Sequence, residues 1–135
     1  MKINTITPQI PNTKKIFKEM NKFFKKKYLS NDGENLLKFE NDLQKYFKSK
    51  LKPIVFCNGE LSLFNLIQAW KYHLGVSKCS AIVPSFTFSG TVNALAQNNI
   101  KPIFCDINNS LTLDLRKIRL QKDTKFIVAA SVYGN

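Results

Sequence analysis

The chain has 135 residues, of which 44% are hydrophobic and 12% aromatic, and its formal net charge is +12 at pH 7. This length suits one ordinary domain and is too short for two, and the apolar content argues against disorder over most of the chain. The apolar runs are far shorter than the ~20 residues of a membrane span, and the first residues lack the apolar stretch of a secretory signal, so we expect no membrane partner.

The basic charge raises the possibility of nucleic-acid binding. Most of the excess falls within residues 1–52 and nearly all of it is lysine, since only Arg116 and Arg119 are arginines. Arginine is the usual reader of base edges and the residue best suited to two-pronged phosphate contacts. The charge pattern therefore favours a solvated, lysine-rich helix surface over nucleic-acid binding, which stays open as the alternative.

The cysteines are Cys57, Cys79 and Cys105, and their spacing matches no metal-binding pattern. An odd number of widely spaced cysteines predicts reduced, mostly buried thiols, so we expect a cytoplasmic protein. A disulfide scaffold and a zinc finger are excluded on this basis.

Two amphipathic helices are predicted within residues 1–52. Apolar side chains recur at helical spacing over residues 14–28, with Thr13 as the N-cap, and again over residues 34–48, after a turn signal at residues 30–33. Lysines occupy the other face of the first helix. We expect its apolar face to pack on a core, and a membrane surface is the alternative.

After Pro53 the pattern alternates between short apolar runs and helical periodicity. It predicts strands at residues 54–57, 81–83, 103–105 and 126–132, with helices at residues 60–74, 89–98 and 114–120 between them. Strands that are apolar on both faces predict a mostly parallel sheet flanked by helices and covered on both sides. The fold class is therefore α/β, with a helical segment at residues 1–52 and an α/β domain at residues 53–135.

Ligands of such sheets bind beyond the carboxyl ends of the strands, which directs attention to two loops. The turn Asn58-Gly59-Glu60 begins a helix, so its free N–H groups can hold a phosphate, or Glu60 is only a favourable acid at a helix start. The loop at residues 84–88 carries two aromatic side chains, which can stack on a flat ring or pack in the core. Glycine-rich nucleotide fingerprints are absent, and no catalytic or metal-ligand pattern emerges from His73, Asp106, Asp114 and Asp123.

Several short segments form a recognisable pattern when they are taken in chain order: Gly33 to Phe39-Glu40, Asn58-Gly59 with Leu63, residues 84–91, residues 102–107, residues 124–127, and Val132-Tyr133-Gly134. Their order and spacing, from about residue 14 to the end, resemble the DegT/DnrJ/EryC1/StrS family of pyridoxal phosphate (PLP) aminotransferases. The resemblance implies the N-terminal part of the large domain of a fold-type I aminotransferase. It also implies a nucleotide-linked keto-sugar as substrate in glycan biosynthesis, glutamate as amino donor, and a homodimer.

By this resemblance, the turn at Gly59, Glu60 and Leu61 donates to the phosphate of PLP, and the ring of Phe88 stacks on its pyridine. The sequence departs from the family at two positions: Glu60 replaces the usual threonine, and Ser131 stands where many members have histidine. An ionised carboxylate repels a phosphate and donates no hydrogen bond, so the first departure weakens the expected phosphate site.

The family's Schiff-base lysine and the acid at the pyridine nitrogen follow the segment that corresponds to Tyr133-Gly134. No residue of this chain is therefore assigned a catalytic role. We expect an N-terminal fragment that is inactive in amino transfer and binds PLP weakly at most. The alternatives are a non-catalytic α/β module that binds a nucleotide or RNA, and a degenerate remnant.

Overall fold

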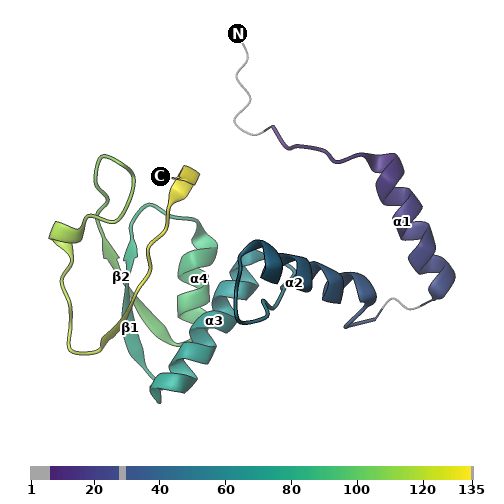
Figure 1. The fold of residues 1–135 in the computed structure, drawn as a ribbon. Coiled ribbons are helices and arrows are strands. Elements are labelled where there is room, and N and C mark those ends of the chain that lie inside the picture. The colour runs from purple at the N-terminus through teal and green to yellow at the C-terminus, as the bar shows by residue number, and fades with distance from the viewer. Residues whose placement is uncertain (1–6, 28–29, 135) are drawn as a thin grey trace, which may run out of the picture. The chain divides into compact units, whose positions relative to one another are not determined.

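The computed structural model describes residues 7–27 and 30–134, and the chain divides into two compact units, Met1–Val55 and Phe56–Asn135 (Figure 1). The first unit contains α1 (Thr13–Lys26) and α2 (Glu34–Tyr46). The second contains α3 (Gly59–Leu74), β1 (Cys79–Pro84), α4 (Ser89–Gln97), β2 (Ile100–Cys105), the 3₁₀ turn η1 (Leu115–Lys117), β3 (Thr124–Ile127) and a last turn η2 (Val132–Gly134). Within the described ranges, no helix has the length and apolar character needed to cross a bilayer.

The N-cap of α1 lies one residue before the cap predicted from the sequence, so that the helix begins at Thr13 itself. The side chain of Asn12, not that of Thr13, accepts a hydrogen bond from the N–H of Lys15 at 3.2 Å, in keeping with the stronger preference of asparagine for the N-cap. No residue of α1 is buried, so the expected packing of its apolar face on a core is not found in the described part of its unit. The predicted end of this helix at Tyr28 lies outside the described residues.

Helix α2 is tied to the segment that follows it by Glu40. This buried carboxylate accepts the N–H of Val55 at 3.3 Å and pairs with the ammonium of Lys52 at 3.0 Å. The Lys52 hydrogen bond, and after it the Val55 hydrogen bond, lower the pKa of Glu40 because both stabilise the charged form. The residues after α2 are thereby held against the helix without a strand.

The sheet has three parallel strands in the order β2-β1-β3. The α/β class and the parallel sheet are confirmed, but the strand predicted at residues 54–57 is wrong. A strand needs a neighbour, and this apolar run is paired with none of the described strands. The predicted strand at residues 126–132 is also too long: β3 ends at Ile127, and the last ladder bond runs from the N–H of Val128 to the carbonyl of Ile82 at 2.8 Å.

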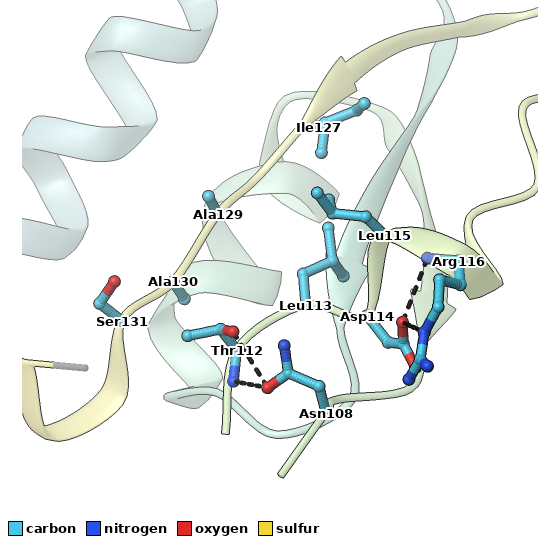
Figure 2. A pocket seen from close by; sticks show the side chains of 10 residues that line it. All are labelled: Asn108, Thr112, Leu113, Asp114, Leu115, Arg116, Ile127, Ala129, Ala130 and Ser131. Carbon is cyan, nitrogen blue, oxygen red and sulfur yellow. Dashed lines mark hydrogen bonds and ion pairs between the residues drawn. The ribbon is translucent and has the colours of Figure 1, made fainter. Parts of the chain in front are cut away.

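One face of the sheet is covered by the connection between β2 and β3. The apolar core between this face and the connection contains Ile82, Cys105 and Leu113. Crossovers between parallel strands are right-handed. The connection from β2 to β3 crosses the sheet in the direction opposite to the connection from β1 to β2, which contains α4, so the two connections are expected on opposite faces. This cover is incomplete: a hollow of about 500 Å³ lies beside Leu113, lined also by residues 129–131 after β3 (Figure 2).

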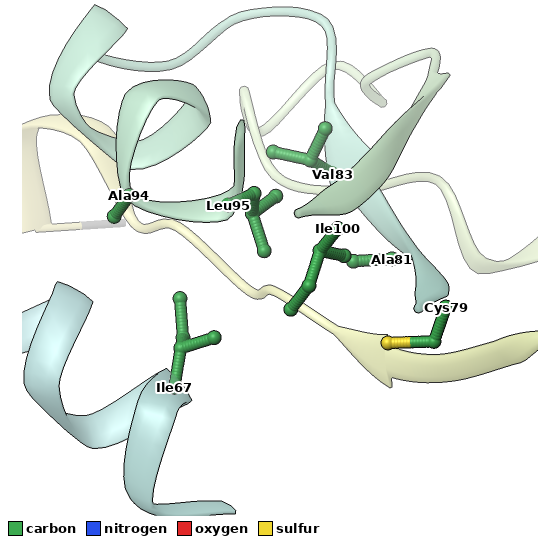
Figure 3. Packing of buried hydrophobic residues seen from close by; sticks show 7 residues of the cluster. All are labelled: Ile67, Cys79, Ala81, Val83, Ala94, Leu95 and Ile100. Carbon is green, nitrogen blue, oxygen red and sulfur yellow. The ribbon is translucent and has the colours of Figure 1, made fainter. Parts of the chain in front are cut away.

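The other face carries both long helices of this unit. Alternate residues of β1, Cys79, Ala81 and Val83, pack with Ile67 of α3 and with Leu95 of α4 (Figure 3). Ala81 and Val83 are fully buried, as expected for a central strand with both edges paired. Because β1, α3 and α4 share this core, the end of β1 and the first turns of both helices belong to one unit. The two loops predicted to bind a ligand lie in the same unit.

Candidate functional site

The first turn of α3 presents two free backbone donors. Asn58 is the N-cap: its side-chain oxygen accepts the N–H of Leu61 at 2.8 Å, and its carbonyl accepts the N–H of Ser62 at 3.1 Å. The N–H groups of Gly59 and Glu60 have no hydrogen-bond partner in the described part of the chain. Free N–H groups at a helix start, with its partial positive charge, suit an anion.

Within the described residues, the predicted phosphate turn has free N–H groups at Gly59 and Glu60 but not at Leu61, and its binding of a phosphate stays a prediction. Leu61 belongs to it, but its N–H is already held by Asn58. Gly59 is exposed and has open space where a side chain would be, so its size is not required by a close contact in this structure. The capping role of Asn58 was missed as a site feature, although asparagine directly before a helix is a readable N-cap signal.

The loop after β1 ends on an exposed aromatic ring. The N–H of Ser85 donates to the carbonyl of Cys105 at 2.8 Å, which holds the start of the loop beside the end of β2. Phe88 follows as the N-cap residue of α4, without a side-chain cap bond, and 71% of its surface is exposed. An apolar ring left open to solvent at the carboxyl end of a central strand is available to stack on a flat ligand.

Gly90 brings two of the predicted site residues together. A Cβ atom at Gly90 would lie 2.7 Å from Cε1 of Phe88 and 2.8 Å from Oε2 of Glu60. The ring of Phe88 and the carboxylate of Glu60 therefore both rest against this one glycine, although they come from different helices. Gly90 was missed as a site residue, and its signal in the sequence is only a glycine in the first turn of a helix.

The carboxylate of Glu60 lies where two helices begin. Glu60 belongs to the first turn of α3, and its oxygen rests on Gly90 in the first turn of α4. Both helix starts carry partial positive charge, which favours a negative group at this position. The site thus already contains an anion of its own.

The hollow on the other face of the sheet contains none of the predicted cofactor-binding residues. Its polar groups bond to one another: Asp114 accepts from Nε of Arg116 at 3.0 Å, and Asn108 accepts from Oγ1 of Thr112 at 3.1 Å (Figure 2). The Arg116 guanidinium lowers the pKa of Asp114, which stays ionised as half of this pair. Asp114 therefore has a structural role, and the hollow offers mainly apolar surface.

The remaining candidates from the sequence are separate from the site at Gly90. Asp106 pairs with Lys117 at 2.9 Å, and His73 is exposed and meets the ring of Trp70 edge-on at 5.5 Å. The turn η2 lies close to the loop after β1, since the ring centroids of Tyr133 and Phe86 are 6.5 Å apart. Ser131 is exposed and lines the hollow.

Comparisons with known proteins agree with the resemblance found in the sequence. The profile of the DegT/DnrJ/EryC1/StrS aminotransferase family matches residues 11–135. The chain is 29% identical over 111 residues to GDP-perosamine synthase of Vibrio cholerae, with 79% of this chain and 29% of that protein covered. It is 28% identical over 131 residues to dTDP-4-amino-4,6-dideoxy-D-glucose transaminase of Shigella dysenteriae, with 95% and 34% covered. The chain thus spans about a third of the length of these curated relatives.

The fold also matches a solved structure with a cofactor. NtdA from Bacillus subtilis, with its cofactor PMP bound, superposes with a TM-score of 0.76 at 26% identity, covering 90% of this chain and 28% of that one. PLP is the cofactor of the family to which these matches point, since solved neighbours contain PLP or its amino form PMP. The sequence motifs, the parallel α/β unit and these similarities lead to one conclusion: the chain belongs to the DegT/DnrJ/EryC1/StrS aminotransferase family.

Proposed function

We propose that this chain is the cofactor-binding, N-terminal portion of a PLP-dependent aminotransferase that acts on a nucleotide-linked keto-sugar in glycan biosynthesis. Two relatives named for amino-sugar nucleotides support this substrate class. The observation that carries the proposal is the exposed ring of Phe88 beside the first turn of α3, where two N–H groups are free. The proposal includes glutamate as amino donor, a homodimer, and a cytoplasmic location.

The described residues include the types of group that bind PLP, namely backbone N–H donors and an aromatic ring. The N–H groups of Gly59 and Glu60 donate to the phosphate, while Leu61, held by Asn58, keeps the turn in shape. The exposed ring of Phe88 would hold the pyridine by stacking and would shield one face of it from water. PLP, when bound, supplies an electron sink for the bond changes next to the transferred nitrogen. The carboxylate of Glu60 opposes the phosphate.

Residues 1–135 by themselves are proposed to bind PLP weakly and to transfer no amino groups. The family resemblance implies that the Schiff-base lysine and the acid at the pyridine nitrogen follow the segment that corresponds to Tyr133-Gly134. The chain spans about a third of the length of its curated relatives. Incubation of the 135-residue chain with PLP, glutamate and a nucleotide-linked keto-sugar should yield no 2-oxoglutarate above a protein-free control. Formation of 2-oxoglutarate with a PLP adduct on one defined lysine would contradict this part of the proposal.

The proposed site is tested with pyridoxine 5′-phosphate, which lacks the aldehyde of PLP and so does not react with surface lysines. Replacing Phe88 by alanine should weaken its binding about tenfold, because an aromatic pair contributes ~0.5–1.5 kcal/mol beyond the area that it buries. The matched control is Phe86→Ala, in the same loop, which should change the dissociation constant by less than about twofold, since the proposal gives Phe86 no contact with the ligand. Equal losses in both variants, or no measurable binding, would contradict the proposed site.

A further inference from the structure

We infer that Glu60 is a built-in anion of the cofactor site and that its carboxylate sets how tightly the site holds a phosphate group. The inference rests on the proposed function, and it concerns specificity: with Glu60 ionised, the site favours the aromatic ring of a ligand over its phosphate. The position of this carboxylate, between two helix starts, is the reason.

The geometry fixes where the carboxylate lies. Glu60 is half-buried, and its Oε2 rests at 2.8 Å from the point where a Cβ of Gly90 would be. A side chain at position 90 would exclude it, so the glycine makes room for the carboxylate. Cε1 of Phe88 lies 2.7 Å from the same point. The carboxylate therefore lies beside the ring that is proposed to hold the pyridine.

Electrostatics then determine the direction of the effect. The free N–H groups of Gly59 and Glu60 are the donors available to a phosphate, and the carboxylate belongs to the same turn. A phosphate bound there would face a like charge at short range, and the carboxylate, an acceptor only, would offer it no hydrogen bond. The carboxylate stands at the end of a flexible side chain, so it can swing aside, and phosphate binding is weakened but not abolished.

The test compares two probes that differ only in the phosphate: pyridoxine 5′-phosphate and pyridoxine. Dissociation constants are measured by calorimetry for the wild type, for Glu60→Gln, and for Glu34→Gln as a matched control. Glu34 also lies in the first turn of a helix, and its replacement changes the net charge by the same amount. Circular dichroism confirms that each variant is folded before titration.

Glu60→Gln should bind pyridoxine 5′-phosphate about tenfold more tightly than the wild type, because a like charge at short range is removed. Its affinity for pyridoxine should stay within about twofold, and Glu34→Gln should match the wild type with both probes. The gain should shrink at about 1 M sodium chloride, where the screening length falls to ~3 Å.

Equal affinity of wild type and Glu60→Gln for the phosphate probe would overturn the inference, while the proposed function would stand if binding still depended on Phe88. A gain that is the same at low and high salt would also overturn it, since the cause would then be steric. Failure of both probes to bind any variant would overturn the inference together with the proposed function.

Discussion

The side-chain amide of Asn98 donates a hydrogen bond to the backbone carbonyl of Phe64 at 3.0 Å, joining the end of α4 to the middle of α3. The same nitrogen donates to the carbonyl of Ala94 at 2.9 Å, and only 5% of Asn98 is exposed. The ammonium of Lys71 on α3 donates in turn to the carbonyl of Asn98. The two helices whose first turns form the candidate site are therefore linked by a buried polar group as well as by apolar packing.

Replacing Asn98 by alanine should lower the free energy of unfolding by about 1–3 kcal/mol, because the carbonyls of Phe64 and Ala94 each lose a buried hydrogen-bond donor. Urea denaturation followed by circular dichroism measures the change. Asn93→Ala is the control, since Asn93 is an exposed residue of the same helix, and alanine there should leave stability unchanged or slightly raised. Equal effects of the two substitutions would show that the Asn98 bonds contribute nothing measurable.

Replacing Gly90 by alanine should displace the ring of Phe88 and the carboxylate of Glu60, since the new Cβ would lie within 2.9 Å of both. The obstructing atoms are side-chain ends, and alanine gains ~1 kcal/mol of helix propensity over glycine, so stability should change by less than about 1 kcal/mol. The affinity for pyridoxine should fall severalfold, because the stacking ring has moved. Thermal unfolding and calorimetry separate the two effects.

Ser89→Ala, at the neighbouring exposed position of α4, serves as the control for this substitution. It should leave pyridoxine binding unchanged. A stability loss above about 3 kcal/mol for Gly90→Ala would mean that the surroundings cannot yield and that the contact is with rigid structure.

The pH dependence of the first unit should include a contribution from Glu40. Hydrogen bonds from Lys52 and then Val55 lower its pKa below the ordinary value of 4.5. A carboxyl with a lowered folded-state pKa stabilises the fold above its unfolded-state pKa, and this stability is lost as the pH falls through the folded-state value. Stability should therefore decline below about pH 4.5 in the wild type, and this part of the decline should be missing in Glu40→Gln.

Amide hydrogen exchange provides a local measurement for the same prediction. The N–H of Val55 donates to Glu40, so its protection should fall on acidification in the wild type but not in Glu40→Gln, whose side-chain oxygen still accepts and does not titrate. Glu34→Gln, also on α2, should retain the wild-type pH dependence at Val55. Equal protection in all three proteins would contradict the assigned role.

The cysteines should differ sharply in reactivity towards a thiol reagent. Cys57 is exposed, whereas Cys79 and Cys105 are buried and free. Burial also raises the pKa of Cys79, which reduces its reactive thiolate further. The folded protein should label quickly at Cys57 only, Cys57→Ser should abolish this fast phase, and urea should expose the other two thiols. Fast labelling of Cys57→Ser would contradict the buried positions.

The sequence predicted the helix α3 and the first two strands well because their signals are local. The runs around Ile82 and Ile103 became β1 and β2, and the periodicity after Gly59 became α3. The run at residues 54–57 carries the same apolar signal, but a strand also needs a partner, and no local pattern reports that. For the same reason, the end of β3 at Ile127 was not readable from the apolar residues that follow it.

The individual residues of the candidate site could be predicted from the sequence, but the contact of Glu60 and Phe88 with Gly90 could not. Glu60 and Phe88 were each identified through their motif, and whether they bind the cofactor remains a prediction. Their meeting at Gly90 depends on how α3 and α4 pack, which involves residues far apart in sequence. The capping bond of Asn58 was within reach of sequence reasoning, as was that of Asn12, because both asparagines directly precede a helix.

The strand order has a consequence for how this sheet can be extended and protected. Since β1 is paired on both sides, any additional strand must join at the outer edge of β2 or of β3. Unpaired edges are where β proteins join other chains, and lysines on edge strands oppose such pairing. Lys101 on β2 and Lys125 on β3 are both exposed, so each outer edge of the sheet carries a positive charge that opposes pairing with a strand of another chain.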